Sequence, residues 1–337
     1  MRILVTGGAG YIGSHTVLDL VMNGHSVDVV DSLSNGRREA LIRVRQMSGA
    51  DIPLHQFDVC DTEKLLKLAR VSQFDAVIHF AGLKSVSESV KDPLTYYANN
   101  VGSTISLLHV MQCKGIHKLV FSSSATVYGK PEKSPVTETA QVGVGLTSPY
   151  GRTKFMSEQI IADVVAADPR FEASVLRYFN PFGADPSGFI GEDSRSKPNN
   201  LMPYVSRVAA GKYPIVEVFG NDYDTQDGTG VRDYVHVSDL ARGHRAALEH
   251  SQPGRHTYNL GTGKGTSVLE LIDTFGKVVG RKVPFHVEKR RDGDIGECFA
   301  NVTKAQRELG WEATKSLAEA CEDQWRWQSA NPRGYGS

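Results

Sequence analysis

Residues 1–13 read MRILVTGGAGYIG, and this stretch decides the fold. A short β-rich run ends at Thr6 and passes at once into a turn that carries Gly7, Gly10 and Gly13, where a helical pattern begins. Glycines at this spacing allow a tight turn, a close backbone approach to a pyrophosphate and close packing of helix against strand. The start of the helix would offer N–H groups and a positive dipole end to the phosphates. A glycine-rich turn without a ligand is the alternative, but the strand–turn–helix context favours a dinucleotide site.

The pattern of the first half repeats this alternation of strand and helix. β-Rich runs lie at residues 3–6, 26–31, 54–59, 76–80, 118–123 and 173–177. Helical patterns lie between them, for example at residues 12–23, 62–70, 94–114 and 149–167. Such alternation predicts an α/β fold, a doubly wound parallel sheet (Rossmann) with helices on both faces.

The chain changes character near residue 180, where a segment rich in glycine, proline and charge begins. A chain of 337 residues exceeds the size at which one hydrophobic core grows efficiently, so two domains are expected. We predict a dinucleotide-binding domain over residues 1–179 and a smaller mixed α/β substrate domain over residues 180–337. Residues 234–250 read as one more strand–helix unit and are expected to return to the first domain.

Charge and cysteine content exclude several classes of function. The 38 basic and 38 acidic residues balance, which gives no electrostatic reason to expect nucleic acid or a membrane surface as partner. The four cysteines form no CxxC pair and the histidines no HExxH motif, so no metal site is predicted. The apolar run at the N-terminus is too short for a signal peptide, and no stretch reaches the length of a membrane span. We expect a cytoplasmic protein.

Two acids follow strands where a dinucleotide would meet them. Asp31 closes the second β-rich run, where a carboxylate can bind the adenosine ribose hydroxyls. Because it would repel a 2′-phosphate, NAD is favoured over NADP. A helix-capping role for Asp31 is the alternative. Asp58 ends the third run and would meet the adenine, although a purely structural role is nearly as plausible.

A tyrosine–lysine pair carries the candidate chemistry. Tyr150 and Lys154 stand four residues apart on a predicted helix that Ser148 would cap and Pro149 would begin. The ammonium would favour phenolate and lower the pKa of Tyr150. An exposed amphipathic pair is the alternative, but Ser124 ends the fifth strand at the edge where a cofactor crevice lies, and its hydroxyl can complete a Ser–Tyr–Lys set.

Several motifs in combination resemble the family of UDP-glucose 4-epimerases, within the extended short-chain dehydrogenases/reductases. The resemblance covers nearly the whole chain and rests on TGGAGYIGSH (6–15), HFAGLK (79–84), SSSATVYG (122–129), SPYGRTK (148–154), LRYFNPFGA (176–184), PNNLMPY (198–204) and GVRDYVHVSDLA (230–241).

The resemblance implies three sets of site residues. The catalytic set is Ser124, Tyr150 and Lys154. The cofactor set is Gly7, Gly10, Tyr11, Ile12, Gly13, Asp31, Asn35, Gly36, Asp58, Val59, Phe80, Ala81, Gly82, Lys84, Asn99, Ser124, Tyr150, Lys154 and Phe179. The substrate set is Ser124, Tyr150, Asn180, Asn200, Leu201, Phe219, Arg232, Arg291, Asp294 and Cys298. The two arginines suit a diphosphate, with surface salt bridges as the alternative.

The implied activity is an NAD-dependent interconversion of UDP-glucose and UDP-galactose through a 4-keto sugar. Related dehydratases carry an Asp–Glu pair where this chain has Ala125-Thr126, which disfavours dehydration. The small side chain of Cys298 implies room for the N-acetyl group of UDP-GlcNAc and UDP-GalNAc. The resemblance also implies a homodimer packed through residues 94–114 and 149–167. Another sugar-nucleotide enzyme, such as a dehydratase or decarboxylase, and a non-catalytic NAD-binding regulator are the competing readings.

Overall fold

Strand β1 lies inside a parallel sheet, with strands on both sides of it. This computed structural model describes residues 1–193, 200–291 and 293–336. In that part of the chain, seven parallel strands form one sheet, called the main sheet below, in the order β11-β6-β5-β4-β1-β2-β3. Their bounds are β1 (Arg2–Thr6), β2 (Ser26–Val30), β3 (Leu54–His55), β4 (Ala76–His79), β5 (Lys118–Ser124), β6 (Glu172–Tyr178) and β11 (Gly254–Leu260).

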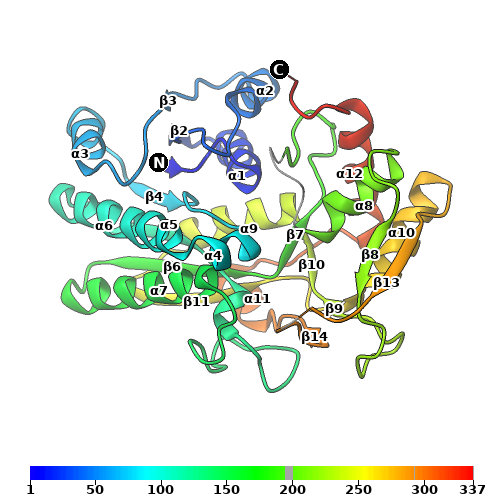
Figure 1. The fold of residues 1–337 in the computed structure, drawn as a ribbon. Coiled ribbons are helices and arrows are strands. Elements are labelled where there is room, and N and C mark those ends of the chain that lie inside the picture. The colour runs from blue at the N-terminus through cyan, green and yellow to red at the C-terminus, as the bar shows by residue number, and fades with distance from the viewer. Residues whose placement is uncertain (194–199, 292, 337) are drawn as a thin grey trace.

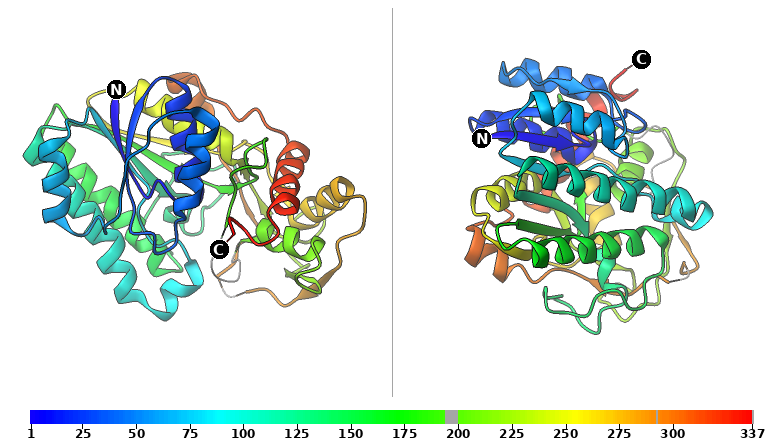
Figure 2. Two further views of the ribbon diagram at one scale, coloured as in Figure 1. Left: turned by 90° about the horizontal axis from the view of Figure 1, so that it is seen from above. Right: turned by 90° about the vertical axis from the view of Figure 1, so that its left-hand side faces the viewer.

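Helices cover both faces of the main sheet, as Figures 1 and 2 show. One face carries α1 (Tyr11–Met22), α2 (Arg38–Ser48) and α9 (Val237–Glu249); the other carries α3 (Thr62–Val71), α6 (Gly102–Lys114) and α7 (Pro149–Ala167). Ile3, Leu4 and Val5 of β1 are at most 1% exposed, as expected for a strand buried on both faces. The predicted α/β architecture is confirmed.

The chain order of the strands reverses at β1. β2 lies on one side of β1, and β4 lies on the other. Loops that leave the carboxyl ends of these two strands therefore separate, and an open crevice forms at this edge of the sheet. The glycine turn that follows β1 lies at this point of reversal.

A smaller region lies beside the main sheet, on the right of Figure 1. Its strands are short: β7 (Asn180–Phe182) pairs with β10 (Tyr234–His236), β8 (Val216–Phe219) pairs with β13 (Phe285–Glu288), and β9 (Val231–Arg232) lies between β12 (Thr266–Ser267) and β14 (Glu297–Cys298). Helices α8 (Leu201–Ala209), α10 (Val268–Val279) and α12 (Leu317–Ala330) pack around an apolar core that contains Val205, Phe275 and Cys321. Helix α11 (Thr303–Leu309) packs against β11 and α9.

Two details differ from the sequence-based expectation. The third strand stops at His55 rather than at Val59, because the backbone turns there and the Asp61 N–H donates to the Asp58 carbonyl. The helix expected over residues 94–114 is divided into α5 (Pro93–Tyr96), a π-helical turn (Tyr97–Val101) and α6. The Asn100 side chain explains the interruption, since it binds Leu83 N and O and the Thr153 hydroxyl instead of facing solvent.

The second half of the chain contributes differently to the main sheet than expected. The unit at residues 234–250 returns only as helix α9, which packs against α1, while its strand β10 pairs with β7 outside the main sheet. The unpredicted strand β11 instead joins β6 in parallel register, with Tyr258 opposite Leu176. β11 carries arginine, histidine and asparagine among its residues, so its pattern is not that of a buried strand. The predicted boundary at residue 179 therefore separates β11 from the sheet to which it belongs.

None of the helices in the described residues is long and apolar enough to cross a membrane. The remaining elements of the described residues are the short helix α4 (Val86–Lys91) and a 3₁₀ turn at Ala125–Tyr128.

Candidate active site

The glycine turn has a shape that only glycine permits. Gly7 has φ of +71°, and its N–H donates to the Val30 carbonyl at 2.8 Å. A Cβ on Gly13 would lie 2.3 Å from the Gly7 carbonyl oxygen, so the first turn of α1 rests directly on the loop. Among the described side chains none caps the start of α1 at Gly10. Its first N–H groups are therefore left for an anion, as a dinucleotide pyrophosphate requires.

Asp31 stands next to this turn with its carboxylate fixed. One oxygen accepts from Ala9 N at 3.0 Å and the other from Leu33 N at 2.8 Å. Burial raises the pKa of Asp31, and these two hydrogen bonds lower it. Gly36 packs so close that a Cβ there would lie 3.0 Å from both carboxylate oxygens. The cradle at Gly7–Gly13 and this fixed acid fit a dinucleotide that carries free ribose hydroxyls.

The other predicted cofactor residues gather at the same edge of the main sheet. Each group follows the carboxyl end of a strand: Asn35 and Gly36 after β2, Asp58 and Val59 after β3, Phe80, Ala81, Gly82 and Lys84 after β4, Ser124 at the end of β5 and Phe179 after β6. Asn99 lies in the π-helical turn, where its carbonyl is 3.6 Å from the Cys60 sulfur. Asp58 is exposed and accepts from Cys60 N at 2.9 Å.

Tyr150 and Lys154 occupy the first turns of α7. The Ser148 hydroxyl accepts from Gly151 N at 3.2 Å, and Pro149 is the first helical residue, as the sequence predicts. The Lys154 ammonium lies 6.0 Å from the centre of the Tyr150 ring. The ammonium donates to the Ser122 carbonyl on β5 at 2.6 Å. The position of Lys154 is therefore fixed both by helix α7 and by this hydrogen bond to the strand.

The hydroxyl of Ser124 completes the set. It hydrogen-bonds to Tyr150, and this contact lowers the pKa of the phenol. It also accepts from the Thr126 N–H at 3.2 Å and from the Thr126 hydroxyl at 3.0 Å. These two donors fix the position of the Ser124 oxygen beside the phenol.

The electrostatics of the pair differ from the expectation. Burial raises the pKa of Tyr150, and a hydrogen bond with Ser124 only partly opposes this. Burial also lowers the pKa of Lys154 to about 8, against the attraction of Glu158. The predicted lowering of the Tyr150 pKa by its lysine neighbour is therefore not what the protein alone produces, because burial acts more strongly on both groups.

A buried ion pair behind the catalytic helix was missed by the sequence analysis. Glu158 follows Lys154 by one turn of α7 and is fully buried. Arg177 on β6 donates to both of its oxygens, at 3.0 and 2.6 Å, and the Ser123 hydroxyl donates to it as well. The spacing of residues 150, 154 and 158 on one helix face is a signal that could have indicated it.

A second buried pair lies beside Tyr150. Tyr178 hydrogen-bonds to Ser122 and to the Nε2 atom of His244, whose Nδ1 atom lies 2.8 Å from the Leu240 carbonyl. Burial lowers the pKa of His244 to about 4, so the ring is neutral. The pair supports the β5 segment whose carbonyl holds the catalytic lysine.

The predicted substrate arginines lie in the smaller region. Arg232 ends β9 and donates to the Val231 carbonyl at 2.8 Å. The Arg291 guanidinium lies over the Phe219 ring, 4.3 Å from its centre, and its Nε atom is 3.1 Å from Asp294. Both cations act electrostatically on the buried Tyr223, whose hydroxyl has no hydrogen-bond partner among the described residues.

Cys298 lies opposite Arg232 in the β9–β14 pair. It packs with Phe179 and Ala300 in one apolar cluster, which brings the smaller region against the end of β6. Burial raises the pKa of the Cys298 thiol to about 11, so the side chain is a neutral, small group. The place of Cys298 beside the C2 substituent of the sugar stays a prediction.

Asp233 organises this part of the site and was not predicted. It is 0% exposed, and four donors point at its carboxylate: the Thr262 N–H and hydroxyl, both at 2.7 Å, Gly263 N at 3.0 Å and Ala300 N at 3.1 Å. Its own carbonyl accepts from Asn180 N at 2.9 Å. The loops around Arg232 are therefore held by one buried acid.

The remaining predicted substrate residues lie at the border of the smaller region. Asn180 is exposed at the start of β7, and Asn200 is exposed just before α8. Leu201 packs against the core of the smaller region. Pro198 and Asn199 of the same motif lie outside the described residues. In the part of the chain that the structure covers, no cluster of three or more His, Cys, Asp or Glu side chains could hold a metal.

Comparison with known protein families shows to which family the chain belongs. The model of the NAD dependent epimerase/dehydratase family matches residues 3–261, which span the main sheet and the catalytic helix. The chain belongs to the NAD-dependent epimerase/dehydratase family. This membership confirms NAD as the cofactor, and the cradle and Asp31 fit it.

Individual members of the family resemble the chain over its whole length. The UDP-glucose 4-epimerase of Bacillus subtilis is 55% identical over 339 residues, and this covers 100% of the chain and 99% of the relative. The human UDP-glucose 4-epimerase is 52% identical, with the same coverage. A crystal structure of UDP-glucose 4-epimerase from Bifidobacterium longum in complex with NAD+ and UDP aligns with a TM-score of 0.96 at 47% identity, covering 99% of this chain and 100% of that one.

Proposed function

We propose that this protein is an isomerase that interconverts UDP-glucose and UDP-galactose by inverting C4 of the sugar. The observation that carries the proposal is the placement of Tyr150 and Lys154 on the first turns of α7 against the end of β5, where Lys154 donates to the Ser122 carbonyl at 2.6 Å and Ser124 ends the strand. A hydroxyl pair of this kind can exchange a proton with a sugar hydroxyl while a nicotinamide exchanges a hydride with the carbon. Relatives over the full chain that carry the epimerase name support the same activity.

Residues of the protein itself accept and return the proton of the sugar 4-hydroxyl. Bound NAD supplies the redox chemistry, the acceptance and return of a hydride at C4. Tyr150, as phenolate, takes the proton of the 4-hydroxyl while the C4–H bond gives up its hydride, which leaves a 4-keto sugar. Ser124 hydrogen-bonds the same oxygen. After the sugar has turned over, Tyr150 returns its proton to the 4-oxygen, and C4 would receive on its opposite face the hydride that NAD supplies.

Inversion requires that the sugar turn while the nucleotide stays bound. Arg232 and Arg291 lie in the smaller region, on β9 and in the segment after β13, rather than on the strands of the main sheet. Two guanidinium groups suit a diphosphate, which they can hold in a bidentate manner. With the diphosphate fixed there, the sugar is free to turn about its link to the phosphate and to present either face.

Dehydration is the main competing reaction within this family. Removing water from the sugar requires an additional acid near Tyr150. Ala125 and Thr126 occupy the turn after β5, and the Thr126 donors are committed to the Ser124 oxygen. This turn thus offers a methyl group and a hydroxyl where an acid and base would be needed, which favours epimerisation.

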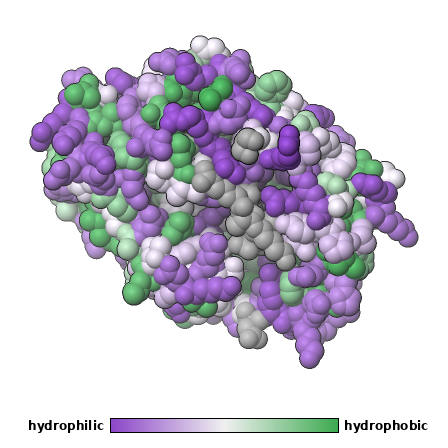
Figure 3. All heavy atoms as spheres, turned by 45° about the horizontal axis from the view of Figure 1, so that its top comes forward, coloured by the Kyte–Doolittle hydropathy of each residue, from purple (hydrophilic) through white to green (hydrophobic). Residues whose placement is uncertain are grey.

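A homodimer in the cytoplasm is part of the proposal. Leu94 is 79% exposed and Ile105 is 52% exposed, on the helices through which dimerisation was expected. Val86, Val90 and Met156 add exposed apolar surface on α4 and α7. By contrast, the face drawn in Figure 3 is mostly hydrophilic, with apolar side chains scattered among polar ones. All four cysteines are free thiols, as suits a reducing compartment.

The direct test is conversion of UDP-galactose by the purified protein, followed by chromatographic separation of the sugar nucleotides. Wild type should yield UDP-glucose without added NAD. Tyr150→Phe keeps the ring but removes the proton acceptor, so kcat should fall by roughly 10²–10⁴. A Tyr150→Phe variant with near-normal turnover would mean that another group is the base. Accumulation of a dehydrated 4-keto sugar would instead identify a dehydratase.

A further inference from the structure

Residues 183–193, called the strap below, cross the mouth of the dinucleotide cradle. Its residues Gly191, Glu192 and Asp193 line one cavity together with Ala9 and Gly10 of the glycine turn. Tyr11, Asn35, Arg37, Lys84 and Tyr335 complete the lining. Because a pyrophosphate binds at the start of α1, the strap lies against the position of the phosphates.

Two ion pairs tie the strap to the larger region. The Lys84 ammonium lies 2.7 Å from Glu192, and the Arg37 Nε atom lies 3.2 Å from Asp193. The side chains of Glu192 and Asp193 are only 5% and 11% exposed. Each acid is thus balanced by a cation at the cradle, so the strap can lie beside a negative pyrophosphate without net repulsion. The Tyr11 hydroxyl donates to the Gly183 carbonyl at 2.6 Å and fixes the other end.

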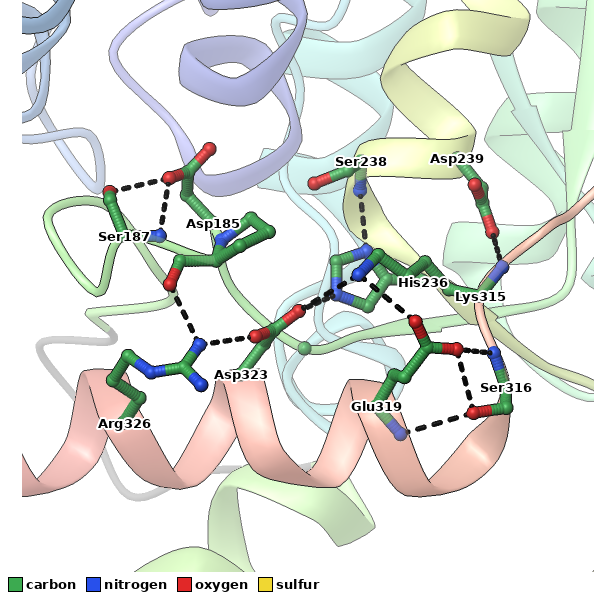
Figure 4. A network of polar contacts seen from close by, with 12 residues as sticks. Asp185, Ser187, His236, Ser238, Asp239, Lys315, Ser316, Glu319, Asp323 and Arg326 are labelled. Atoms are coloured by element: carbon green, nitrogen blue, oxygen red, sulfur yellow. Dashed lines mark hydrogen bonds and ion pairs between the residues drawn. The ribbon is translucent and has the colours of Figure 1, made fainter.

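Helix α12 and the residues after it hold the outer side of the strap. Arg326 donates to the Pro186 carbonyl at 2.7 Å and also pairs with Asp323, as Figure 4 shows. The Trp327 Nε1 atom donates to the Glu192 carbonyl at 3.2 Å. Gly191 packs on the Trp327 ring so closely that a Cβ there would lie 2.5 Å from it. The strap therefore has no room to move outward while α12 stays in place.

The side chains of Tyr335 and Arg43 bind the backbone of the strap and hold it in this position. The Tyr335 hydroxyl accepts from Gly191 N at 3.2 Å and donates to the Gly191 carbonyl at 3.1 Å. Arg43 on α2 donates to the Phe189 carbonyl at 2.9 Å and to the Asn331 side chain at 2.7 Å, and it lies 5.0 Å from the centre of the Tyr335 ring. Arg43 thus joins the dinucleotide-binding half, the strap and the segment after α12.

We propose that the strap is a latch that retains NAD, and that Arg43 and Tyr335 are its fastening residues. NAD can leave only when the strap moves from the cradle, so every contact made only in the closed state slows release. The reaction regenerates NAD in each cycle and does not need this opening. The UDP-sugar groups instead meet Arg232 and Cys298 in the smaller region, on β9 and β14 rather than on the strap.

The test compares two arginines of α2. Arg43→Met removes the hydrogen bonds to Phe189 of the strap and to Asn331, together with the ion pair to Glu39. Arg45→Met on the same helix removes an exposed pair with Asp51. Purified protein that carries its NAD is placed in excess ADP-ribose, and NAD(H) in the ultrafiltrate is followed with time. Arg43→Met should release NAD at least about tenfold faster, as expected for the loss of a charge-assisted hydrogen bond. Arg45→Met should release it at the wild-type rate.

Tyr335→Phe keeps the ring and removes the hydroxyl that bonds to Gly191, so it decides the question if Arg43→Met does not fold. Faster release from this variant supports the latch. Wild-type release rates in both variants would overturn it. An equal acceleration by Arg45→Met would also overturn it, because that residue does not touch the strap.

Discussion

At the scale of single residues, the proposed mechanism requires that the phenol of Tyr150 lose its proton inside the protein. Burial raises the pKa of Tyr150, and the hydrogen bond from Ser124 only partly opposes this. The oxidised nicotinamide ring of bound NAD is itself a cation, and a cation near a phenol favours the phenolate. Lys154 adds a second positive charge 6.0 Å from the ring.

Removal of the lysine charge should move the pH dependence of the reaction. Without a cation the phenolate is less favourable, so the pKa of Tyr150 rises and the phenolate is lost at a higher pH than in wild type. In Lys154→Met, the rise of kcat with pH should therefore shift to higher pH, with lower activity at neutrality. Initial rates measured with UDP-galactose across the pH range check this. A profile with unchanged position and lower height would assign Lys154 a purely structural role.

Cys298 should determine whether N-acetylated sugars fit. Its neutral thiol packs beside Phe179, and a tyrosine there would fill the space that an N-acetyl group needs. We predict that wild type interconverts UDP-GlcNAc and UDP-GalNAc, and that Cys298→Tyr loses this activity and keeps UDP-galactose. Separation of both sugar-nucleotide pairs after incubation measures it. If wild type leaves UDP-GalNAc unchanged while converting UDP-galactose, the size of this residue does not set the substrate range.

Individual site residues were accessible from sequence when they belonged to a local pattern. Ser148, Tyr150 and Lys154 could be placed on one helix, because capping and helical spacing are local properties. Asp233 was missed, since its four donors come from residues 262–300 and no local pattern indicates them.

At the scale of elements, α7 is held by the buried pair behind its catalytic face. Glu158 is fully buried, and Arg177 donates to both of its oxygens. Glu158→Gln would leave the guanidinium buried without its charge partner, which should lower the free energy of unfolding by about 3–5 kcal/mol. Denaturant unfolding measures this. The exposed Asp163 of the same helix gives the control, since Asp163→Asn should stay within about 0.5 kcal/mol. Equal stability of both variants would show that the pair contributes little.

Helices and strands could be predicted from the sequence where the apolar residues that become buried recur with a clear period. Helix α7 has the predicted bounds, and strands β1, β4 and β5 differ by one residue at an end. Strand β11 was missed because its polar residues do not form the pattern of a buried strand. Its partner β6 is also far away in sequence, so no local signal indicates the pairing. The π-helical turn was missed because it depends on bonds from Asn100 to two other segments.

At the scale of the whole molecule, the site lies where two regions of different architecture meet. The main sheet supplies the cradle, the catalytic helix and Phe179, and the β9–β14 pair brings Arg232 and Cys298 against them. The strap closes the dinucleotide side of this junction and is fastened by residues after α12. Figure 2 shows that this last segment lies beside α2, although most of the chain separates them in sequence. Only the folded molecule shows this arrangement.

We propose that one molecule of the protein, with the NAD that it keeps, removes a hydride from C4 and returns it to the same carbon. The most direct test of this claim uses UDP-galactose that carries deuterium at C4, incubated with purified protein without added NAD. The UDP-glucose formed is then analysed by mass spectrometry. We predict that the product keeps its deuterium at C4, because the hydride never leaves the closed site. UDP-glucose without deuterium, or no conversion until NAD is added, would contradict the claim.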